Sequence, residues 1–376
     1  MDTIQMVDLK KQYQHIKKEI DDSVLGVLES AAFINGKPVQ NFSNNLAAYL
    51  GVKHVIPCAN GTDALQIAMM ALDLQPGDEV ITPSFTYIAT TEVVALLRLK
   101  PVFVDVDAKT FCLDPVAVEK AITPKTKAIV PVHLYGHAAP MEEIIAIARK
   151  YNLLVIEDTA QAMGADYIFS DGRKVKTGTM GHVGCTSFFP SKNLGCYGDG
   201  GAMYTNDDAL AEKLRMVANH GQKTRYYHDL IGCNSRLDTI QAAILDVKLP
   251  HLDTYNTARR KAAAYYDQGF ANHPKIETPL QAPFTQHVFH QYTLTLHHAD
   301  RDGLNVHLAE KNIPSMIYYP VPSHKQKAFE GFGGATFDLP VTDWLTQRVI
   351  SLPMHSELSK EQQDYIIEAV LEYMVK

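Results

Sequence analysis

Lys192 follows a run of small and apolar residues and opens a glycine-rich loop. The run spans Thr186–Pro190, and four glycines lie between residues 195 and 201. A lysine amine that is buried at the end of a strand loses hydration, which lowers its pKa and makes it nucleophilic. Taken alone, such a lysine is more often an ordinary surface residue of a loop, so Lys192 needs chemical partners before it is given a role.

A second apolar run, Leu153–Ile156, is followed by Glu157 and then by Asp158. A carboxylate in that position holds a nearby nitrogen base in its protonated form, because the negative charge favours the cation. Gln161 follows one short turn later, and its amide can donate to an oxygen atom of a ligand. An acidic residue at a strand end also caps helices, which is the structural alternative for Asp158.

The turn Ala59–Leu65 opens a helix directly after another predicted strand. Free backbone N–H groups and the positive end of the helix dipole bind phosphate at such a turn, here at Gly61 and Thr62. The hydroxyl groups of Thr62 and Ser187 add further donors. A generic helix start has the same features, so the turn alone is weak support for a ligand site.

Tyr87 lies in the segment Thr82–Thr90, again just beyond a predicted strand. Its ring can stack flat on an aromatic ligand, a contact that contributes about 1 kcal/mol beyond the area it buries. Plain packing of an aromatic side chain in a loop is the alternative.

The four features together match what pyridoxal 5'-phosphate (PLP) requires of a protein. The cofactor needs a lysine for its aldehyde, a carboxylate at the pyridine nitrogen, an anion site for its phosphate and a flat group against its ring. They occur in the order anion site, aromatic ring, carboxylate and lysine, each at the end of a different predicted strand. The combination therefore predicts a PLP enzyme more strongly than any single feature does.

Strands alternate with helices along the chain, which predicts an α/β fold with a mostly parallel sheet sandwiched by helices. In such sheets ligands bind beyond the carboxyl ends of the strands. A long helical pattern from Arg236 to about Gly269, bent near Pro250, predicts a break between a large domain at 1–249 and a smaller C-terminal α+β domain at 250–376. The predicted strands are Val52–Pro57, Glu79–Thr82, Lys100–Val106, Ala128–Leu134, Leu153–Glu157, Gly184–Phe189 and Gln291–Leu296, and the predicted helices include Asp63–Leu72, Thr91–Leu97, Met141–Tyr151 and Ala209–Asn219.

The chain of 376 residues, 46% of them hydrophobic, is long enough for two hydrophobic cores. Its net charge of −7 argues against a general affinity for nucleic acids or anionic membranes. The start lacks a basic and apolar leader, and no apolar run approaches the ~20 residues that span a bilayer, so we expect a cytoplasmic protein. Five scattered cysteines without metal-ligand spacing predict reduced thiols and no metal site.

The sequence resembles the DegT/DnrJ/StrS family of sugar-nucleotide aminotransferases, which have the fold-type I PLP architecture. The likeness extends over essentially the whole chain, from Phe33–Gly36 through the segments above to Ser351–His355, and is most specific at Thr186–Gly201. It implies a homodimer with shared active sites. It also implies Lys192 as the Schiff-base residue and proton shuttle, Asp158 at the pyridine nitrogen, Gln161 at the phenolic oxygen, Tyr87 over the ring, Gly61, Thr62 and Ser187 at the phosphate, and Asn234 at the phosphate of the other subunit.

The resemblance further implies the reaction. An amino acid, expected to be glutamate, gives up its amino group and leaves the cofactor as pyridoxamine 5'-phosphate, which then aminates a keto-sugar nucleotide. The relatives that look most similar aminate a UDP-linked 3-keto-N-acetylhexosaminuronate in surface-polysaccharide synthesis, such as that of O-antigen. The substrate-side residues implied in this way are His220, Arg225, Arg236, Tyr318 and Tyr319.

Some alternatives stay open. Those relatives typically read His-Tyr-Pro where this chain has Tyr318-Tyr319-Pro320. Because tyrosine carries no positive charge at neutral pH, neither the uronate nor the carbon that is aminated is fixed. Dehydratases of the same family replace the lysine by histidine, so Lys192 favours transamination over a PLP-dependent dehydratase or lyase. A non-catalytic regulator that binds PLP or a sugar is the alternative from another class.

Overall fold

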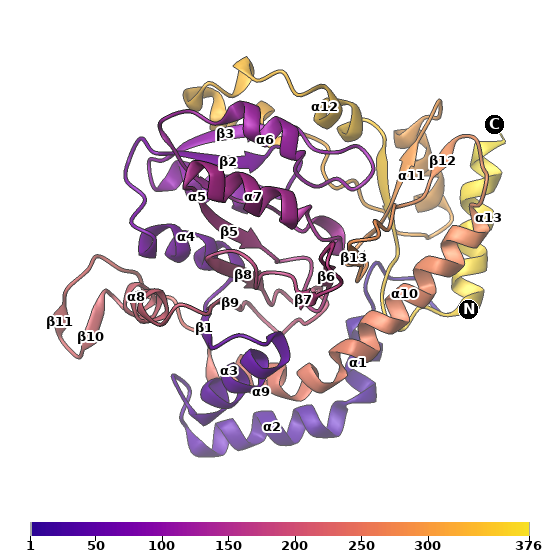
Figure 1. Ribbon diagram of the computed structural model, residues 1–376. Coiled ribbons are helices and arrows are strands. Elements are labelled where there is room, and N and C mark those ends of the chain that lie inside the picture. The colour runs from indigo at the N-terminus through magenta and orange to yellow at the C-terminus, as the bar shows by residue number, and fades with distance from the viewer. Residues whose placement is uncertain (1, 376) are drawn as a thin grey trace.

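A seven-stranded sheet forms the centre of the computed structural model, which describes residues 2–375 (Figure 1). The strand order is β1-β9-β8-β5-β4-β2-β3, and β9 alone is reversed, being antiparallel to both β1 and β8. The predicted mostly parallel sheet is confirmed. Its strands are β1 (His54–Cys58), β2 (Glu79–Pro83), β3 (Lys100–Val104), β4 (Thr126–Ile129), β5 (Leu154–Asp158), β8 (Val183–Ser187) and β9 (Gly201–Thr205).

Helices cover both faces of this sheet. Successive residues of a strand point to opposite faces, and the hydrophobic clusters divide accordingly. Val155 packs in one cluster with α6 and α7, whereas its neighbour Ile156 packs in another with α4, α5 and α8. Both faces of the sheet are therefore buried under helices, as a mostly parallel sheet requires. The helices are α4 (Gly61–Ala71), α5 (Ala89–Leu96), α6 (Pro115–Ala121), α7 (Met141–Tyr151) and α8 (Asp208–Ala218).

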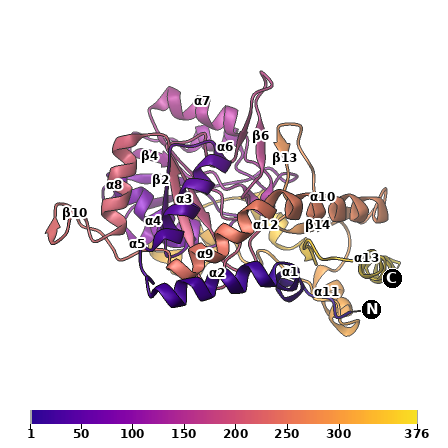
Figure 2. The ribbon, with the colours of Figure 1, turned by 90° about the horizontal axis from the view of Figure 1, so that it is seen from below.

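A further layer of helices lies at the β1 and β9 edge. Phe42 of α3 packs against Phe188, just beyond β8, with ring centroids 5.4 Å apart. Ile20 of α2 packs on Ile244 of α9, and Figure 2 shows α2 along the outer side of α9. These helices are α1 (Leu9–His15), α2 (Lys17–Ser30), α3 (Lys37–Leu50) and α9 (Thr239–Lys248).

The bend predicted near Pro250 is present. After α9 a 3₁₀ turn, Leu249–His251, leads into α10 (Leu252–Gly269), which runs from the central sheet to the last helix, α13 (Figure 1). There a small sheet and its helices form a separate hydrophobic cluster, which Ile4 of the N-terminal segment joins. The elements are β12 (Ile276–Glu277), β14 (Tyr292–Leu296), β15 (Val349–Leu352), α11 (Arg301–Glu310) and α13 (Lys360–Met374).

Two later segments return to the central sheet. β13 (Thr285–Gln286) pairs with β6 (Asp166–Ile168), which also pairs with β7 (Lys174–Lys176). Leu345 of α12 (Pro340–Thr346) joins the cluster of α6 and α7. The domain limits at 1–249 and 250–376 stay a prediction.

The strand expected at 128–134 is shorter than predicted. β4 ends at Ile129, because Pro131 has no N–H to continue the ladder. Val132 then makes a single bridge to Asp158, and the chain turns at Tyr135, whose φ is 57°. This detour brings the residues after β4 to the end of β5.

A hairpin of β10 (Gln222–Thr224) and β11 (Tyr227–His228) projects from the body of the molecule (Figure 1). None of the helices in residues 2–375 has both the length and the apolar character of a membrane-crossing segment. In the same part of the chain no three His, Cys, Asp or Glu side chains are grouped to hold a metal ion, and the five cysteines are free.

Candidate active site

Asp158 is the last residue of β5, and its carboxylate is buried at the carboxyl edge of the sheet. Oδ2 accepts a hydrogen bond from Thr90 Oγ1 at 2.8 Å, and Oδ1 accepts one from the Ala160 N–H at 3.1 Å. Burial raises the pKa of Asp158, although these two hydrogen bonds and the nearby charge of Lys192 oppose the shift. A negative charge is thus held in a nearly dry position with a cation beside it.

Lys192 lies in the loop between β8 and β9, where its N–H donates to the carbonyl oxygen of Phe189 at 2.8 Å. Burial lowers the pKa of its amine to about 8, and the charge of Asp158 acts in the opposite direction. Within residues 2–375 the amine has no hydrogen-bond or ion-pair partner. A lysine in this state has a large neutral fraction near physiological pH and is free to react.

The start of α4 has the features that the sequence predicted for an anion site. The Asn60 side chain accepts from the Asp63 N–H at 2.8 Å, which leaves the N–H groups of Gly61 and Thr62 without an acceptor in the described part of the chain. Ser187, at the end of β8, lies against this turn: a Cβ added to Gly61 would be 2.7 Å from the Ser187 Cβ. Two amides without an acceptor and the positive end of the helix dipole thus lie beside Ser187.

We expect Gly61→Ala to damage this site measurably. The added methyl group collides with Ser187, so the free energy of unfolding should fall by about 1–3 kcal/mol. Affinity for PLP should fall with it, because α4 and β8 must move apart. Urea denaturation and titration with PLP measure the two effects. Gly26→Ala in α2, with no atom within 4 Å of the added Cβ, is the matched control and should raise stability by about 0.5–1 kcal/mol without changing PLP affinity.

Gln161 and a group of aromatic side chains lie on the same edge. Gln161 Oε1 accepts from the Tyr135 N–H at 2.7 Å, and Nε2 donates to the Tyr319 hydroxyl oxygen at 2.9 Å. The Tyr319 ring lies 6.2 Å from the Tyr87 ring, which is itself 57% exposed. Tyr318 is held by the hydroxyl of Tyr135, which donates to its carbonyl oxygen. The structure therefore brings together Asp158, Lys192, Gln161, Tyr87 and Tyr319.

Four of the predicted residues lie outside this group. His220 and Asn234 are exposed at the base of the β10–β11 hairpin, and Arg225 lies near its tip, 4.9 Å from the centre of the Tyr226 ring. Arg236 is partly buried just before α9. Among residues 2–375 none of the four forms a hydrogen bond or ion pair with Asp158, Gln161 or Lys192.

Two side chains at the site had no signal in the sequence. Thr90 reaches Asp158 across 68 positions of sequence. Ser235 Oγ accepts from the Ala59 N–H at 3.0 Å and donates to Asp63 Oδ2 at 2.7 Å, which holds the turn before α4 in place. Single hydroxyl groups carry no pattern, so only the assembled fold identifies them.

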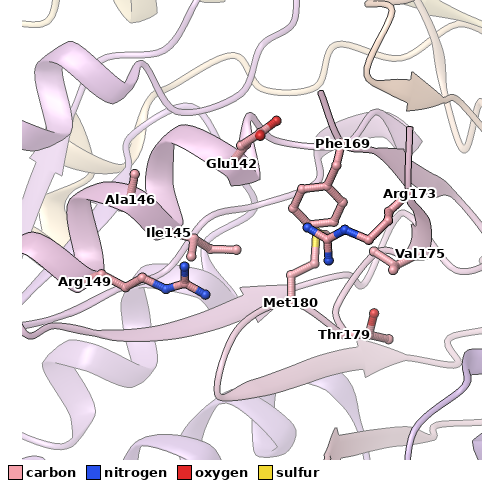
Figure 3. A pocket seen from close by; sticks show the side chains of 9 residues that line it. All are labelled: Glu142, Ile145, Ala146, Arg149, Phe169, Arg173, Val175, Thr179 and Met180. Carbon is pink, nitrogen blue, oxygen red and sulfur yellow. The ribbon is translucent and has the colours of Figure 1, made fainter. Parts of the chain in front are cut away.

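A groove of about 430 Å³ lies elsewhere, between α7 and the β6–β7 hairpin (Figure 3). The guanidinium groups of Arg149 and Arg173 lie over its apolar floor, and Arg173 is paired with Asp171 at 2.7 Å. The groove contains none of the predicted site residues. It is therefore separate from the cluster around Lys192.

Comparison with known proteins decides the family. A profile of the DegT/DnrJ/EryC1/StrS aminotransferase family matches residues 14–371. The chain belongs to this family. Two curated relatives are each 48% identical to this chain. One is the "pleiotropic regulatory protein" of Geobacillus stearothermophilus, aligned over 98% of both chains, and the other is the UDP-2-acetamido-2-deoxy-3-oxo-D-glucuronate aminotransferase of Pseudomonas aeruginosa, aligned over 94% of this chain and 96% of the relative.

A solved structure of the family agrees over the full length. Streptomyces venezuelae DesV, crystallised with a ketimine intermediate, superposes with a TM-score of 0.95 and 41% identity over 100% of both chains. Aminotransferases of the DegT family depend on PLP. The buried carboxylate, the unpartnered amine and the open helix start fit this cofactor.

Proposed function

We propose that this PLP-dependent aminotransferase moves an amino group from an amino acid, with glutamate as the expected donor, to a UDP-linked 3-keto sugar. The observation that carries the proposal is that the partly buried Lys192 and the buried Asp158 lie at one sheet edge, each acting on the other's charge. The relative from P. aeruginosa, named for a UDP-linked 3-oxo sugar, supports the acceptor. The reaction would take place in the cytoplasm, in the synthesis of surface polysaccharide such as O-antigen.

Lys192 would hold the cofactor covalently and, as a free amine, would take the proton from the α-carbon of the amino acid. Its lowered pKa, about 8, leaves enough neutral amine for both tasks. Asp158 keeps the pyridine nitrogen protonated by its charge, and Thr90 holds the carboxylate in place. When bound, PLP supplies the electron sink for the bonds that break at that carbon.

The other residues bind and orient. Gly61, Thr62 and Ser187 hold the phosphate at the start of α4. Gln161 donates one amide hydrogen to Tyr319, and its second amide hydrogen would be available for the phenolic oxygen. Tyr87 covers the ring. His220, Arg225, Arg236, Tyr318 and Tyr319 form the substrate side.

The active unit is a homodimer in this proposal. Tyr226, Tyr227 and Ile231 on the β10–β11 hairpin are 75%, 69% and 87% exposed, which is costly for large apolar side chains on a projecting arm. A second copy would cover them and bring Asn234, at the base of the arm, to the phosphate of its partner. In this proposal the hairpin projects because it packs on the second copy. The predicted site residues on it lie far from Lys192 of their own chain because they serve the partner's site.

Replacing Tyr226, Tyr227 and Ile231 together by serine should dissociate the dimer, because it removes the apolar contacts of the arm. Sedimentation velocity is the measurement, and a monomer is expected. Val306→Ser, which changes a 58% exposed apolar residue of α11, is the control and should leave the dimer intact. A triple variant that sediments like the wild type would overturn this assignment of the interface.

A two-part assay tests the function itself. Purified holoenzyme with glutamate should release 2-oxoglutarate in a stoichiometric first half-reaction. Holoenzyme with glutamate and a panel of UDP- and dTDP-linked 3- and 4-keto sugars, neutral and uronate, should yield an amino sugar that mass spectrometry and NMR identify. Release of water from the sugar without gain of nitrogen would instead favour a dehydratase.

A further inference from the structure

Thr86 and Thr90 extend the hydrogen bonds of Asp158 by one further step. Thr86 lies in the loop after β2, and Thr90 lies in the first turn of α5. Thr90 Oγ1 donates to Asp158 Oδ2 at 2.8 Å and lies 3.1 Å from Thr86 Oγ1. Both threonines are buried, with 4% of Thr86 and 1% of Thr90 exposed. The three side chains therefore form a hydrogen-bonded row inside the protein.

The charge of Asp158 fixes the direction of this row. A hydroxyl group has a single hydrogen, and an ionised carboxylate can only accept. The hydrogen of Thr90 therefore goes to Asp158, so the hydrogen of Thr86 must go to Thr90. Hydrogen bonds that point the same way polarise and strengthen one another. With Asp158 ionised, the hydrogen atoms of both hydroxyl groups are bonded.

A protonated Asp158 would break this arrangement. A proton on Oδ2 would go to Thr90, and the hydrogen of Thr90 would turn to Thr86. Thr86 Oγ1 has no other hydrogen-bond partner among residues 2–375, so its own hydrogen would then have no acceptor, which is costly for a buried group. A proton on Oδ1 would instead weaken the bond that this oxygen accepts from the Ala160 N–H at 3.1 Å. The row therefore favours the charged carboxylate.

Burial works against that charge. It is the largest effect on the pKa of Asp158 and raises it, whereas the charges of Lys192 and His133 lower it. Burial also raises the pKa of three titratable neighbours, so these carry no charge at neutral pH. They are Cys185, Tyr204 and Tyr319. A carboxylate that must stay ionised in this environment benefits from each hydrogen bond that stabilises its charge.

We propose that Thr86 and Thr90 are positioning residues that keep Asp158 ionised, because their row of hydrogen bonds is satisfied only when it points toward the carboxylate. The inference rests on the role proposed above for Asp158 at the pyridine nitrogen. Thr86 does not contact the carboxylate and acts through Thr90. A carboxylate that is kept charged can in turn hold the nitrogen of a bound cofactor protonated.

Titration of Asp158 in the cofactor-free protein tests the proposal without enzyme turnover. The protein is labelled with ¹³C at the side-chain carboxyl groups of aspartate, and the Asp158 signal is identified by its loss in Asp158→Asn. Thr90→Val should raise the midpoint by about one pH unit or more, because a hydrogen bond to a charged group is lost. Thr86→Val should raise it by a smaller amount, since Thr90 loses the bond that fixes its direction.

The double variant gives the sharpest result. Once Thr90 is replaced by valine, Thr86 has no path to the carboxylate, so adding Thr86→Val should shift the midpoint no further. Thr86→Ser and Thr90→Ser keep the hydroxyl groups and should titrate like the wild type. A wild-type midpoint in either folded valine variant would overturn the proposal. An equal effect of Thr86→Val with and without the Thr90 hydroxyl would do the same.

Thr91→Val is the matched control. Thr91 is the next residue of α5, is 0% exposed and donates its hydroxyl to the Ile88 carbonyl oxygen at 3.0 Å. The variant loses a hydroxyl hydrogen bond in the same helical turn but should leave the Asp158 midpoint unchanged. A shift as large as that of Thr90→Val would indicate a general effect of packing and contradict the proposal. Urea denaturation shows which variants fold.

The unaltered protein provides a second test if a valine variant does not fold. The buried hydroxyl proton of Thr90 should show scalar coupling across the hydrogen bond to the Asp158 carboxyl carbon at neutral pH. An Asp158 that is protonated at neutral pH, with the Thr90 proton directed at Thr86, would refute the proposal. Failure of the sugar assay alone, with the titration as expected, would refute the proposed function and leave this row standing. A contrary titration with a successful sugar assay would do the reverse.

Discussion

Lys192→Ala should lower the rate of amino transfer by about a thousandfold or more. The variant loses the group that joins the cofactor and the base that moves the proton, and a positioned proton-transfer group alone accounts for about 10²–10⁴ in rate. The protein should still fold, because the amine has no partner in the described chain whose loss would unsettle the loop. Stopped-flow measurement of each half-reaction, with 2-oxoglutarate and amino sugar as products, gives the rates.

Two variants sharpen this test. Lys192→Arg keeps the positive charge next to Asp158 but has no neutral amine at any working pH, so it should be as inactive as the alanine variant. Lys127→Ala, at an exposed lysine of β4, should transaminate at the wild-type rate. If Lys192→Ala retained full activity, both the nucleophile and the base would have to be sought elsewhere.

Asp158→Asn should lower the rate by about a hundredfold or more. The amide is of the same size and can keep the contact with Thr90, but it has no charge to hold the pyridine nitrogen protonated, which removes the electron sink. Steady-state kinetics should show the loss in kcat more than in KM.

The same change should not destabilise the cofactor-free protein at neutral pH. Because burial raises the pKa of Asp158 above 3.8, the unfolded chain ionises first, and ionisation costs stability as the pH rises from there. Removal of the charge therefore leaves the free energy of unfolding equal or higher, as expected for a group kept for function. Urea denaturation at pH values on either side of 3.8 tests the sign. Asp267→Asn, at another acid whose pKa burial raises, is the control and should leave kcat unchanged.

The sequence was most informative about residues at strand ends. Apolar runs identify strands, and in a parallel sheet their carboxyl ends meet at one edge, so Gly61, Asp158 and Lys192 were predictable as neighbours. Their types then suggested the cofactor. Helix α7 was predicted at its observed limits, because its apolar residues recur at a clear helical spacing.

Contacts between distant segments were not predictable in this way. β9 inserts between β1 and β8, an order that no local pattern contains. Thr90 and Ser235 gain their significance from partners far along the chain, and their own residue types are common in packed cores. The early end of β4 depends on Pro131, whose missing N–H matters only because β5 lies alongside.

The attachment site of the cofactor tests the central claim most directly. Holoenzyme is reduced with borohydride, which fixes PLP on the lysine that holds it, and the protein is digested and mapped by tandem mass spectrometry. The account predicts one modified peptide, with the cofactor on Lys192. Cofactor fixed on any other lysine, or a fully loaded protein whose Lys192 is unmodified, would contradict it.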